Sequence, residues 1–254
     1  MVRMAGVNKY MSWITSMVIQ TLLLYVLAML NWLKFGLKAV VILGCIFVVV
    51  RIGSIIFRVG KLPFEGIHYF DVWMIVIGII MGRILFASPL IHYDNYSHWA
   101  LIIKYLLFQG HLPVAADTII SFTSYPPATA LFITQFVSWV GFSDGAMLLG
   151  QFLLIWASIY GIFAVLRDRT RSTNSFVICF AVSIINIFNI SIRMNNLLVD
   201  FILPVMTLAG FSIIYTYRYQ LKKATFILVW VLGLLTIVKS TGSLFALFDL
   251  LYFV

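Results

Sequence analysis

Charged residues are scarce in this sequence. Only 10% of its 254 residues are Asp, Glu, Lys or Arg, whereas 63% are hydrophobic, and the mean hydropathy is +1.08. A soluble domain carries roughly a quarter charged residues, so a chain of this composition could not cover its surface in water. The composition therefore excludes an ordinary soluble domain and predicts an integral membrane protein.

Cysteines and processing signals are also scarce. The two cysteines, Cys45 and Cys179, both lie in apolar runs, so no disulfide framework is expected. The first apolar run, from Trp13 to Trp32, is as long as a full span and ends without a small-residue cleavage site, so no cleavable signal peptide is evident. The net charge of +9 does not predict nucleic-acid binding, because basic residues flank membrane helices as topology determinants.

Eight apolar segments are candidates for membrane spans. They cover about residues 12–32, 39–58, 69–88, 126–142, 147–166, 175–192, 198–217 and 224–245. If all eight crossed the membrane, two basic loops would face opposite compartments, against the positive-inside rule. The conflict disappears if 126–142, the shortest segment, is an interfacial or re-entrant helix. The sequence thus predicts an all-α, polytopic membrane helical bundle with about seven spans.

The basic residues then divide unequally between the two sides of the membrane. Those on the inferred cytoplasmic side, with the N-terminus, are Arg3, Lys9, Arg58, Lys61, Arg167, Arg169, Arg171, Arg218, Lys222 and Lys223. Those outside are Lys34, Lys38, Lys104 and Arg193, of which Lys34 and Lys38 fit the rule poorly. We expect an N-terminal two-helix hairpin over 1–68 and a core over 69–254, with one long external loop at 88–146 that contains interfacial helices.

The candidate chemistry centres on the stretch His92-Tyr93-Asp94-Asn95-Tyr96-Ser97-His98-Trp99, where the third span leaves the membrane. If the chain is helical from about Asp94, then Asp94 and His98 lie one turn apart on one face. That arrangement would join an acid and an imidazole at the water–lipid boundary, with Trp99 and Tyr105 at headgroup depth. The alternative is that Asp94 or Asn95 only caps the helix.

Three more charged residues stand in or beside apolar segments. Lys239 lies in Thr236-Ile237-Val238-Lys239-Ser240-Thr241-Gly242, Asp200 opens the seventh segment, and Arg83 precedes Asp94 by a few turns. Charges within spans are costly and usually functional, so all three are candidate substrate-binding residues. The alternative is snorkelling of Arg83 and Lys239 to the membrane surface.

The order of these features resembles the GT-C superfamily of membrane glycosyltransferases, in particular protein O-mannosyltransferases and bacterial aminoarabinose transferases. The residues that carry the resemblance are Asp94-Asn95-Tyr96-Ser97-His98-Trp99, Tyr125-Pro126-Pro127-Ala128, Gly141, the span that closes at Arg167-Asp168-Arg169, Leu197-Leu198-Val199-Asp200 and Lys239-Ser240-Thr241-Gly242. The resemblance covers about residues 70–245. Members usually continue with further spans, so it implies a truncated or short member.

The resemblance implies an enzyme of the bacterial plasma membrane that moves a sugar from a polyprenyl-phosphate carrier to an acceptor at the external face. Asp94 would be the general base or would position the acceptor, with His98 beside it. The cation on the leaving phosphate would be Lys239 or Arg83, and Asn95, Trp99 and Asp200 complete the expected substrate site. Asn95 stands where the family often has a second acid, which weakens any metal-dependent version.

Other interpretations remain open at this point. His92, Asp94 and His98 are candidate ligands of a divalent cation, although two histidines and one aspartate in a loop are weak evidence for a metal. A transporter or flippase subunit would use Arg83, Asp200 and Lys239 as a charged pathway and should contain internal repeats. An inactive GT-C-like scaffold would retain the fold without the chemistry. The expected partners are lipids, with no nucleic acid.

Overall fold

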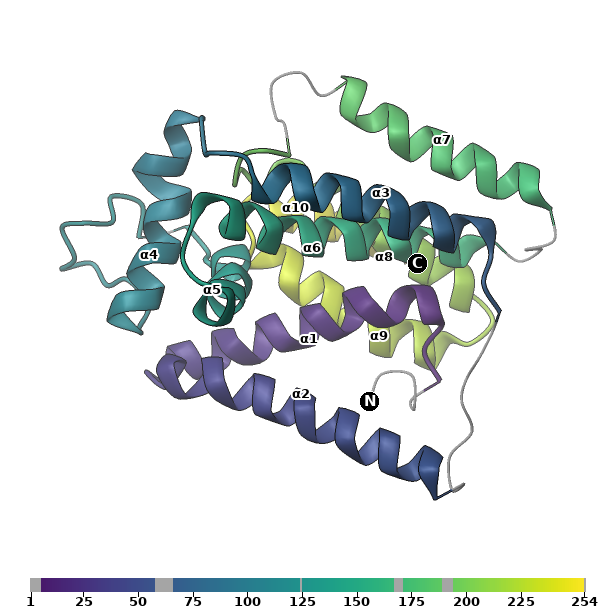
Figure 1. Ribbon diagram of the computed structural model, residues 1–254, viewed down its shortest axis with the longest axis horizontal. Helices are drawn as coiled ribbons and strands as arrows, with labels where there is room; N and C mark the ends of the chain where they lie inside the picture. The colour runs from purple at the N-terminus through teal and green to yellow at the C-terminus, as the bar shows by residue number, and fades with distance from the viewer. Residues whose placement is uncertain (1–5, 58–65, 124, 167–170, 189–193, 254) are drawn as a thin grey trace.

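A computed structural model of the chain describes residues 6–57, 66–123, 125–166, 171–188 and 194–253. Within these ranges every regular element is a helix, so the all-α prediction is confirmed (Figure 1). The helices are α1 (Lys9–Met29), α2 (Leu33–Ile56), α3 (Tyr69–Phe86), the π-helical η2 (Asn95–Trp99), α4 (Ala100–Gln109), α5 (Ala128–Val140), α6 (Asp144–Ile162), the 3₁₀-helical η3 (Phe163–Val165), α7 (Ser172–Phe188), α8 (Ile202–Tyr217), α9 (Leu221–Thr236) and α10 (Gly242–Phe253).

Four helical runs in the described ranges are long and apolar enough to cross a membrane: α1, α2, α3 and the run Asp144–Val165, which joins α6 and η3. A helix of about 20 residues matches the hydrocarbon thickness of roughly 30 Å. None of the apolar window of α2 is buried, and Ile42, Val49 and Ile56 are more than half exposed. An apolar surface of this size is typical of contact with lipid.

The predicted segments match the helices closely, with one correction. Each of the first seven segments corresponds to one helical run, but the segment 224–245 is divided into α9 and α10. Lys239 therefore lies in the turn between two helices and not within a span. Gly242 permits this turn, because a Cβ there would lie 1.9 Å from the Leu235 carbonyl oxygen. A lysine inside a spanning helix is costly to desolvate, whereas the turn lets its ammonium reach a partner.

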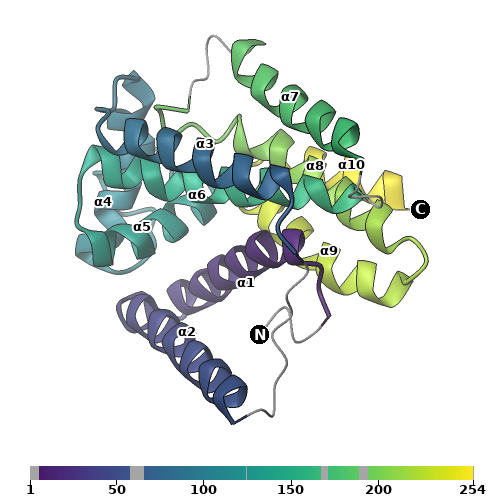
Figure 2. The ribbon, with the colours of Figure 1, turned by 45° about the vertical axis from the view of Figure 1, so that its right-hand side comes forward.

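The central element of the bundle is α6, which contacts α1, α3, α5 and α8. Its first turn touches the end of α3 so closely that a Cβ at Gly145 would lie 1.9 Å from the Phe86 carbonyl oxygen. Close backbone approach through small residues is how helices associate where no water drives them together. By contrast, α2 packs on α1 near its start and then diverges from the bundle, as both ribbon views show (Figures 1 and 2).

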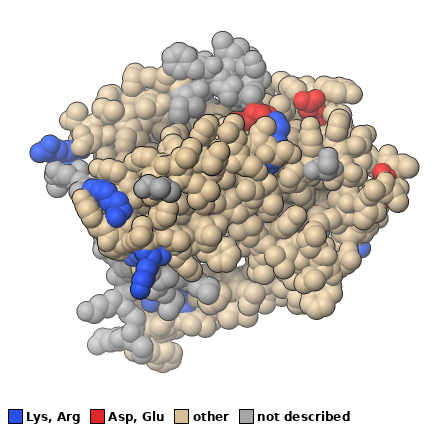
Figure 3. All heavy atoms as spheres, turned by 180° about the vertical axis from the view of Figure 1, so that it is seen from behind, with Lys and Arg blue, Asp and Glu red and all other residues tan. Residues whose placement is uncertain are grey.

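The bundle has two ends, named here after the predicted orientation. The outer end holds the last turns of α3 and α9 and the first turns of α2 and α6, and the inner end holds the first turn of α3 and the α8–α9 turn. On the face seen in Figure 3, lysine and arginine atoms gather toward the inner end, and the visible acidic atoms lie toward the outer end. Arg218, Lys222 and Lys223 belong to the inner end by sequence.

Several residues on which the orientation and the resemblance depend lie outside the described residues. They are Arg3, Arg58, Lys61, Arg167, Asp168, Arg169 and Arg193. The orientation, the number of seven spans and the arrangement of the loop 88–146 therefore stay predictions.

At the inner end, a charged cluster joins three helices. The Lys9 ammonium lies 2.9 Å from Asp71 Oδ2 and also donates to the Gly66 carbonyl oxygen. The Tyr160 hydroxyl donates to Asp71 Oδ1 at 2.7 Å, and the His68 N–H donates to Oδ2 at 2.9 Å. Every polar group in this cluster has a partner, so the cluster fastens α1, α3 and α6 together.

Candidate functional site

The exit of α3 is fixed at the outer end before the candidate motif begins. The Leu90 N–H donates to Asp144 Oδ2 at 3.1 Å, and the Tyr96 hydroxyl donates to the Leu90 carbonyl oxygen. Asp144 is in the first turn of α6, so the central helix holds the chain where it turns away from α3. The motif is thus attached to the core of the bundle, although it follows a connecting segment.

Asp94 lies near the start of one continuous helical stretch that runs through η2 into α4. It has helical backbone angles and makes no side-chain cap hydrogen bond, and its side chain is 50% exposed. His92 Nδ1 lies 3.8 Å from Asp94 Oδ2. The capping interpretation is therefore not supported, and the Asp94 carboxylate is available to solvent or to a ligand.

Asn95 connects the motif to a distant part of the chain. Its side chain is fully buried, and its Oδ1 accepts the Leu197 N–H at 2.9 Å. Its Nδ2 has no partner among the described residues. The π-helical turn at Asn95–Trp99 is a form that occurs mostly as a single turn and often at functional sites. Asn95 therefore holds the 94–99 motif against the segment that precedes α8.

His98 lies in an aromatic enclosure. Its ring is edge-on to those of Trp99, Phe122 and Tyr125, with centroids 4.8, 5.7 and 5.0 Å away. Burial lowers the pKa of His98 from its ordinary value of 6.5, and the charge of Asp94 opposes that effect. His98 Nδ1 is buried and has no partner in the described part of the chain. The imidazole is thus neutral near pH 7 and has an unused nitrogen.

The Pro-Pro element links this enclosure to the turn that contains Lys239. Tyr125, which precedes Pro126, contacts His98, and the Ala128 N–H donates to the Ile237 carbonyl oxygen at 3.0 Å. Two residues later, the Lys239 ammonium donates to Asp200 Oδ1 at 2.7 Å. The side chains of Lys239 and Asp200 are 25% and 33% exposed.

These contacts form a closed ring, which we call the outer ring. The Asn95 side chain accepts a hydrogen bond from the Leu197 N–H, and Asp200, three residues later, forms the ion pair with Lys239. In the same turn as Lys239, the Ile237 carbonyl oxygen accepts the Ala128 N–H, and the nearby Tyr125 ring contacts the His98 ring. Four motifs that are far apart in sequence thus meet at one end of the bundle. A buried carboxamide, an imidazole, an ion pair and a half-exposed carboxylate together can bind an anionic, hydroxylated ligand and accept a proton from it.

Other expected site residues are placed differently. Arg83 is exposed in the last turn of α3, and no hydrogen bond or ion pair among the described residues joins it to the outer ring. Trp99 and Tyr105 are only 7% and 6% exposed, so both face the protein interior and not the surface expected for headgroup contact. The exposed aromatic side chains of this stretch are those of Tyr93, Tyr96 and Phe108.

Two residues that support the ring are absent from the sequence-based site. Gln151, about two turns into α6 from the outer end, donates through Nε2 to the carbonyl oxygens of Asn196 and Leu198, at 3.0 and 3.3 Å. Asn196 Oδ1 in turn accepts the Leu198 N–H. The signal in the sequence is an amide within an apolar run, because a buried amide needs partners. Gln151 Oε1 has no partner within the described ranges.

The expected metal ligands do not gather in the described residues. No group of three His, Cys, Asp or Glu side chains there is placed to hold a metal ion. His92 and Asp94 are neighbours, but His98 is turned into its aromatic enclosure. We therefore assign no step to a divalent cation.

Comparison of the chain with protein-family models, with curated proteins and with solved structures finds no match.

Proposed function

We propose that the outer ring is the active site of a membrane glycosyltransferase of the GT-C type, which moves a sugar from a polyprenyl-phosphate carrier to an acceptor hydroxyl. The observation that carries the proposal is the closed ring of contacts among residues 94–99, 125–128, 195–200 and 237–239. These are four of the motifs on which the family resemblance rests, and they converge near a half-exposed carboxylate that follows a candidate span.

In the proposed reaction, the acceptor oxygen attacks the anomeric carbon of the sugar. The bond between that carbon and the carrier phosphate oxygen breaks, and the polyprenyl phosphate leaves with the bonding electron pair. Asp94 takes the proton of the acceptor hydroxyl, and its negative charge also favours the cationic character that develops at the anomeric carbon. Its exposure suits this role, since a base must reach a substrate that arrives from outside the protein.

The leaving phosphate needs a cation, and Lys239 is the one in the ring. Its ion pair with Asp200 keeps the ammonium compensated when no substrate is bound, which avoids an isolated charge near the membrane. An arriving phosphate would share the ammonium with Asp200. Arg83 is exposed close to the α3 exit and would interact with the carrier headgroup from the outer side.

His98 and Asn95 have positioning roles in this proposal. The neutral His98 ring lies beside Asp94 and has an unused nitrogen for a hydrogen bond. Asn95 fixes the motif against Leu197 and leaves Nδ2 without a partner among the described residues. Buried polar atoms without partners are rare in folded proteins, so these two atoms are consistent with a site that a substrate completes.

The exchange of Asp94 for Asn tests the proposal. It keeps the size of the side chain and removes the base, so sugar transfer should fall about 10²- to 10⁴-fold, with unchanged thermal stability. Asp117→Asn is the matched control, because Asp117 lies in the same external segment and accepts from Tyr105 and Val114. Near-normal transfer by Asp94→Asn would refute the catalytic role. Absence of transfer from the parent protein would favour the scaffold interpretation.

The finer topology belongs to the same proposal: a bacterial plasma-membrane protein with a cytoplasmic N-terminus, about seven spans and the loop 88–146 outside. The support is that α5 has only 13 residues and lies among α1, α4 and α6. Single cysteines would be placed at Ser121, Ser143 and Ser172 in a background without Cys45 and Cys179. The first two should label from outside and the third from inside. If Ser121 and Ser143 label from opposite sides, the segment 126–142 spans and the orientation is wrong.

A further inference from the structure

Two lysines at the start of α2 are electrostatically misplaced. Lys34 and Lys38 are exposed and lie one turn apart on the same face of the helix. Like charges at this spacing repel each other, and a helix N-terminus disfavours cations. They are also on the side of the membrane where the predicted topology has few basic residues. No carboxylate of the described residues pairs with either lysine. Such a pair is stabilised when an anion binds between the two ammonium groups.

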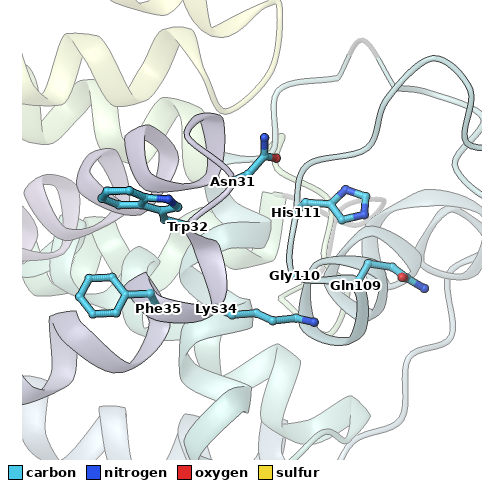
Figure 4. A pocket seen from close by; sticks show the side chains of 7 residues that line it. All are labelled: Asn31, Trp32, Lys34, Phe35, Gln109, Gly110 and His111. Atoms are coloured by element: carbon cyan, nitrogen blue, oxygen red, sulfur yellow. The ribbon is translucent and has the colours of Figure 1, made fainter.

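The surroundings of Lys34 form a shaped hollow. Its volume is about 660 Å³, and it is lined by Trp32, Lys34, Phe35 and the turn Gln109–His111 (Figure 4). The stem of Lys34 runs along Gly110, where a Cβ would lie 2.2 Å from Lys34 Cε. Gly110 ends α4 with φ +77°, a conformation that glycine adopts readily. The backbone of this turn therefore gives the Lys34 side chain a defined course along the surface.

A second hollow of about 380 Å³ continues from the first. Lys34 lines both, and the second adds Lys38, Ser138 and Trp139. The Trp139 Nε1–H donates to the Leu37 carbonyl oxygen at 3.4 Å, so the start of α2 is joined to the end of α5. Two lysines and a serine therefore line one hollow, together with an aromatic ring of the kind found at membrane interfaces.

A third, apolar hollow follows below Trp139. Its volume is about 660 Å³, and it lies between α2 and α5, with Gly44, Val48, Phe132 and Phe136 in its walls. Beyond its start, α2 diverges from the rest of the bundle (Figures 1 and 2). The three hollows share Lys34 and Trp139 in succession, so a basic headgroup region leads into an apolar groove.

We propose that this run of hollows binds an anionic phospholipid of the leaflet at the outer end. The phosphate lies between Lys34 and Lys38, and one acyl chain lies in the groove between α2 and α5. The charge complementarity supports an anionic lipid over a zwitterionic one, because no acidic residue lines any of the three hollows. The site is separate from the outer ring, and the proposal does not depend on glycosyltransferase activity.

Native mass spectrometry of the full chain in detergent tests the lipid class. The probes are phosphatidylglycerol and phosphatidylcholine with identical acyl chains, and phosphatidylglycerol should be retained more strongly. A basic residue near an anionic lipid headgroup contributes enough to change affinity about fivefold. Lys34→Gln and Lys38→Gln should each weaken phosphatidylglycerol binding by about that factor, and the double variant by roughly 25-fold. Lys104→Gln, an exposed lysine of α4 outside the hollows, is the matched control.

The groove is tested by filling it. Gly44→Leu places a side chain in the apolar hollow, and a Cβ at Gly44 meets no atom within 4 Å, so the fold should be retained. Its phosphatidylglycerol binding should fall. Gly53→Leu is the control, because Gly53 is on the same helix, is equally open and does not line the hollow.

Four results would overturn the proposal. They are equal retention of both lipids, unchanged binding by the double lysine variant, equal losses in Gly44→Leu and Gly53→Leu, or displacement of the lipid by inorganic phosphate alone. Polyprenyl phosphate that binds with the same dependence on Lys34 and Lys38 would instead assign the hollows to the carrier. Asp94→Asn should leave phosphatidylglycerol binding unchanged, so failure of the proposed catalytic site and failure of the lipid site are distinguishable.

Discussion

The two ends of the bundle use polar residues in opposite ways. At the inner end, Lys9, Asp71 and Tyr160 satisfy one another, and each belongs to a different helix. At the outer end, Asn95 Nδ2, His98 Nδ1 and Gln151 Oε1 are buried without partners among the described residues. An unpaired buried polar atom is costly. The polar residues at the inner end therefore contribute to stability, whereas the three unpaired atoms at the outer end reduce it.

This difference separates residues that hold the helices together from residues that are available for a ligand. The hydrogen bonds of the inner cluster run between its own members, from Lys9 and Tyr160 to Asp71. The outer ring combines rigid support, through Asn95–Leu197 and Gln151–Asn196, with open groups such as the Asp94 carboxylate. Mutations at the two ends should therefore have different signatures, in stability at the inner end and in activity at the outer end.

The largest effect on stability should come from the inner cluster. Asp71→Ala removes the partner of Lys9 and an acceptor of Tyr160 and the His68 N–H. Loss of one member of a fully buried ion pair costs about 3–5 kcal/mol. Because Lys9 is 19% exposed and can regain water, we expect about 2 kcal/mol, measured as thermal unfolding in detergent. Asp94→Ala should change stability little, and equal losses in the two variants would remove the contrast between the ends.

An intermediate effect is expected at Asn95, which both supports the fold and belongs to the proposed site. Asn95→Ala leaves the buried Leu197 N–H without its acceptor, which should cost about 1 kcal/mol of unfolding free energy. Asn95→Asp keeps an acceptor oxygen and should retain more of the stability. Thermal unfolding and sugar-transfer rates would be measured for the parent protein, Asn95→Ala and Asn95→Asp. If Asn95→Ala is as stable as the parent, the contact with Leu197 does not hold the motif in place.

The smallest effect is a dependence of stability on pH through His98. Burial depresses the pKa of His98 in the folded protein below its ordinary value of 6.5, so the unfolded chain binds the proton more readily. The contribution is then fully present above about pH 6.5 and is lost as the pH falls through the interval between the two pKa values. Unfolding of the parent and of His98→Gln across this range should show a steeper acid loss for the parent. Parallel curves would show that His98 carries no such effect.

The helices could be predicted from the sequence because long apolar runs have few alternatives in a membrane protein. The break between α9 and α10 could not, since Ile237 and Val238 continue the apolar run, whereas the folded chain turns there and brings Gly242 against the Leu235 carbonyl oxygen. Local spacing also placed Asp94 and His98 on one helical stretch, which the backbone of residues 93–109 confirms.

The outer ring itself was only partly predictable. The resemblance selected Asp94, Asp200 and Lys239, but the Asp200–Lys239 ion pair joins residues 39 positions apart and the Asn95–Leu197 bond joins residues 102 apart. Such pairings depend on how α3, α6 and α8 pack, and helical periodicity does not determine that packing. Gln151 was missed for the same reason, because its partners are backbone carbonyls of a segment remote in sequence.

Photocrosslinking tests most directly the claim that the outer ring, and not the inner cluster, binds the carrier. A polyprenyl phosphate with a photoreactive group next to the phosphate would be added to the full chain in detergent, and the modified peptides would be mapped by mass spectrometry. We expect crosslinks in residues 92–99, 195–200 and 237–241, reduced when unlabelled polyprenyl phosphate competes and when Lys239 is replaced by Met. Crosslinks confined to the region of Lys9 and Asp71, or spread evenly over the lipid-facing helices, would contradict the account.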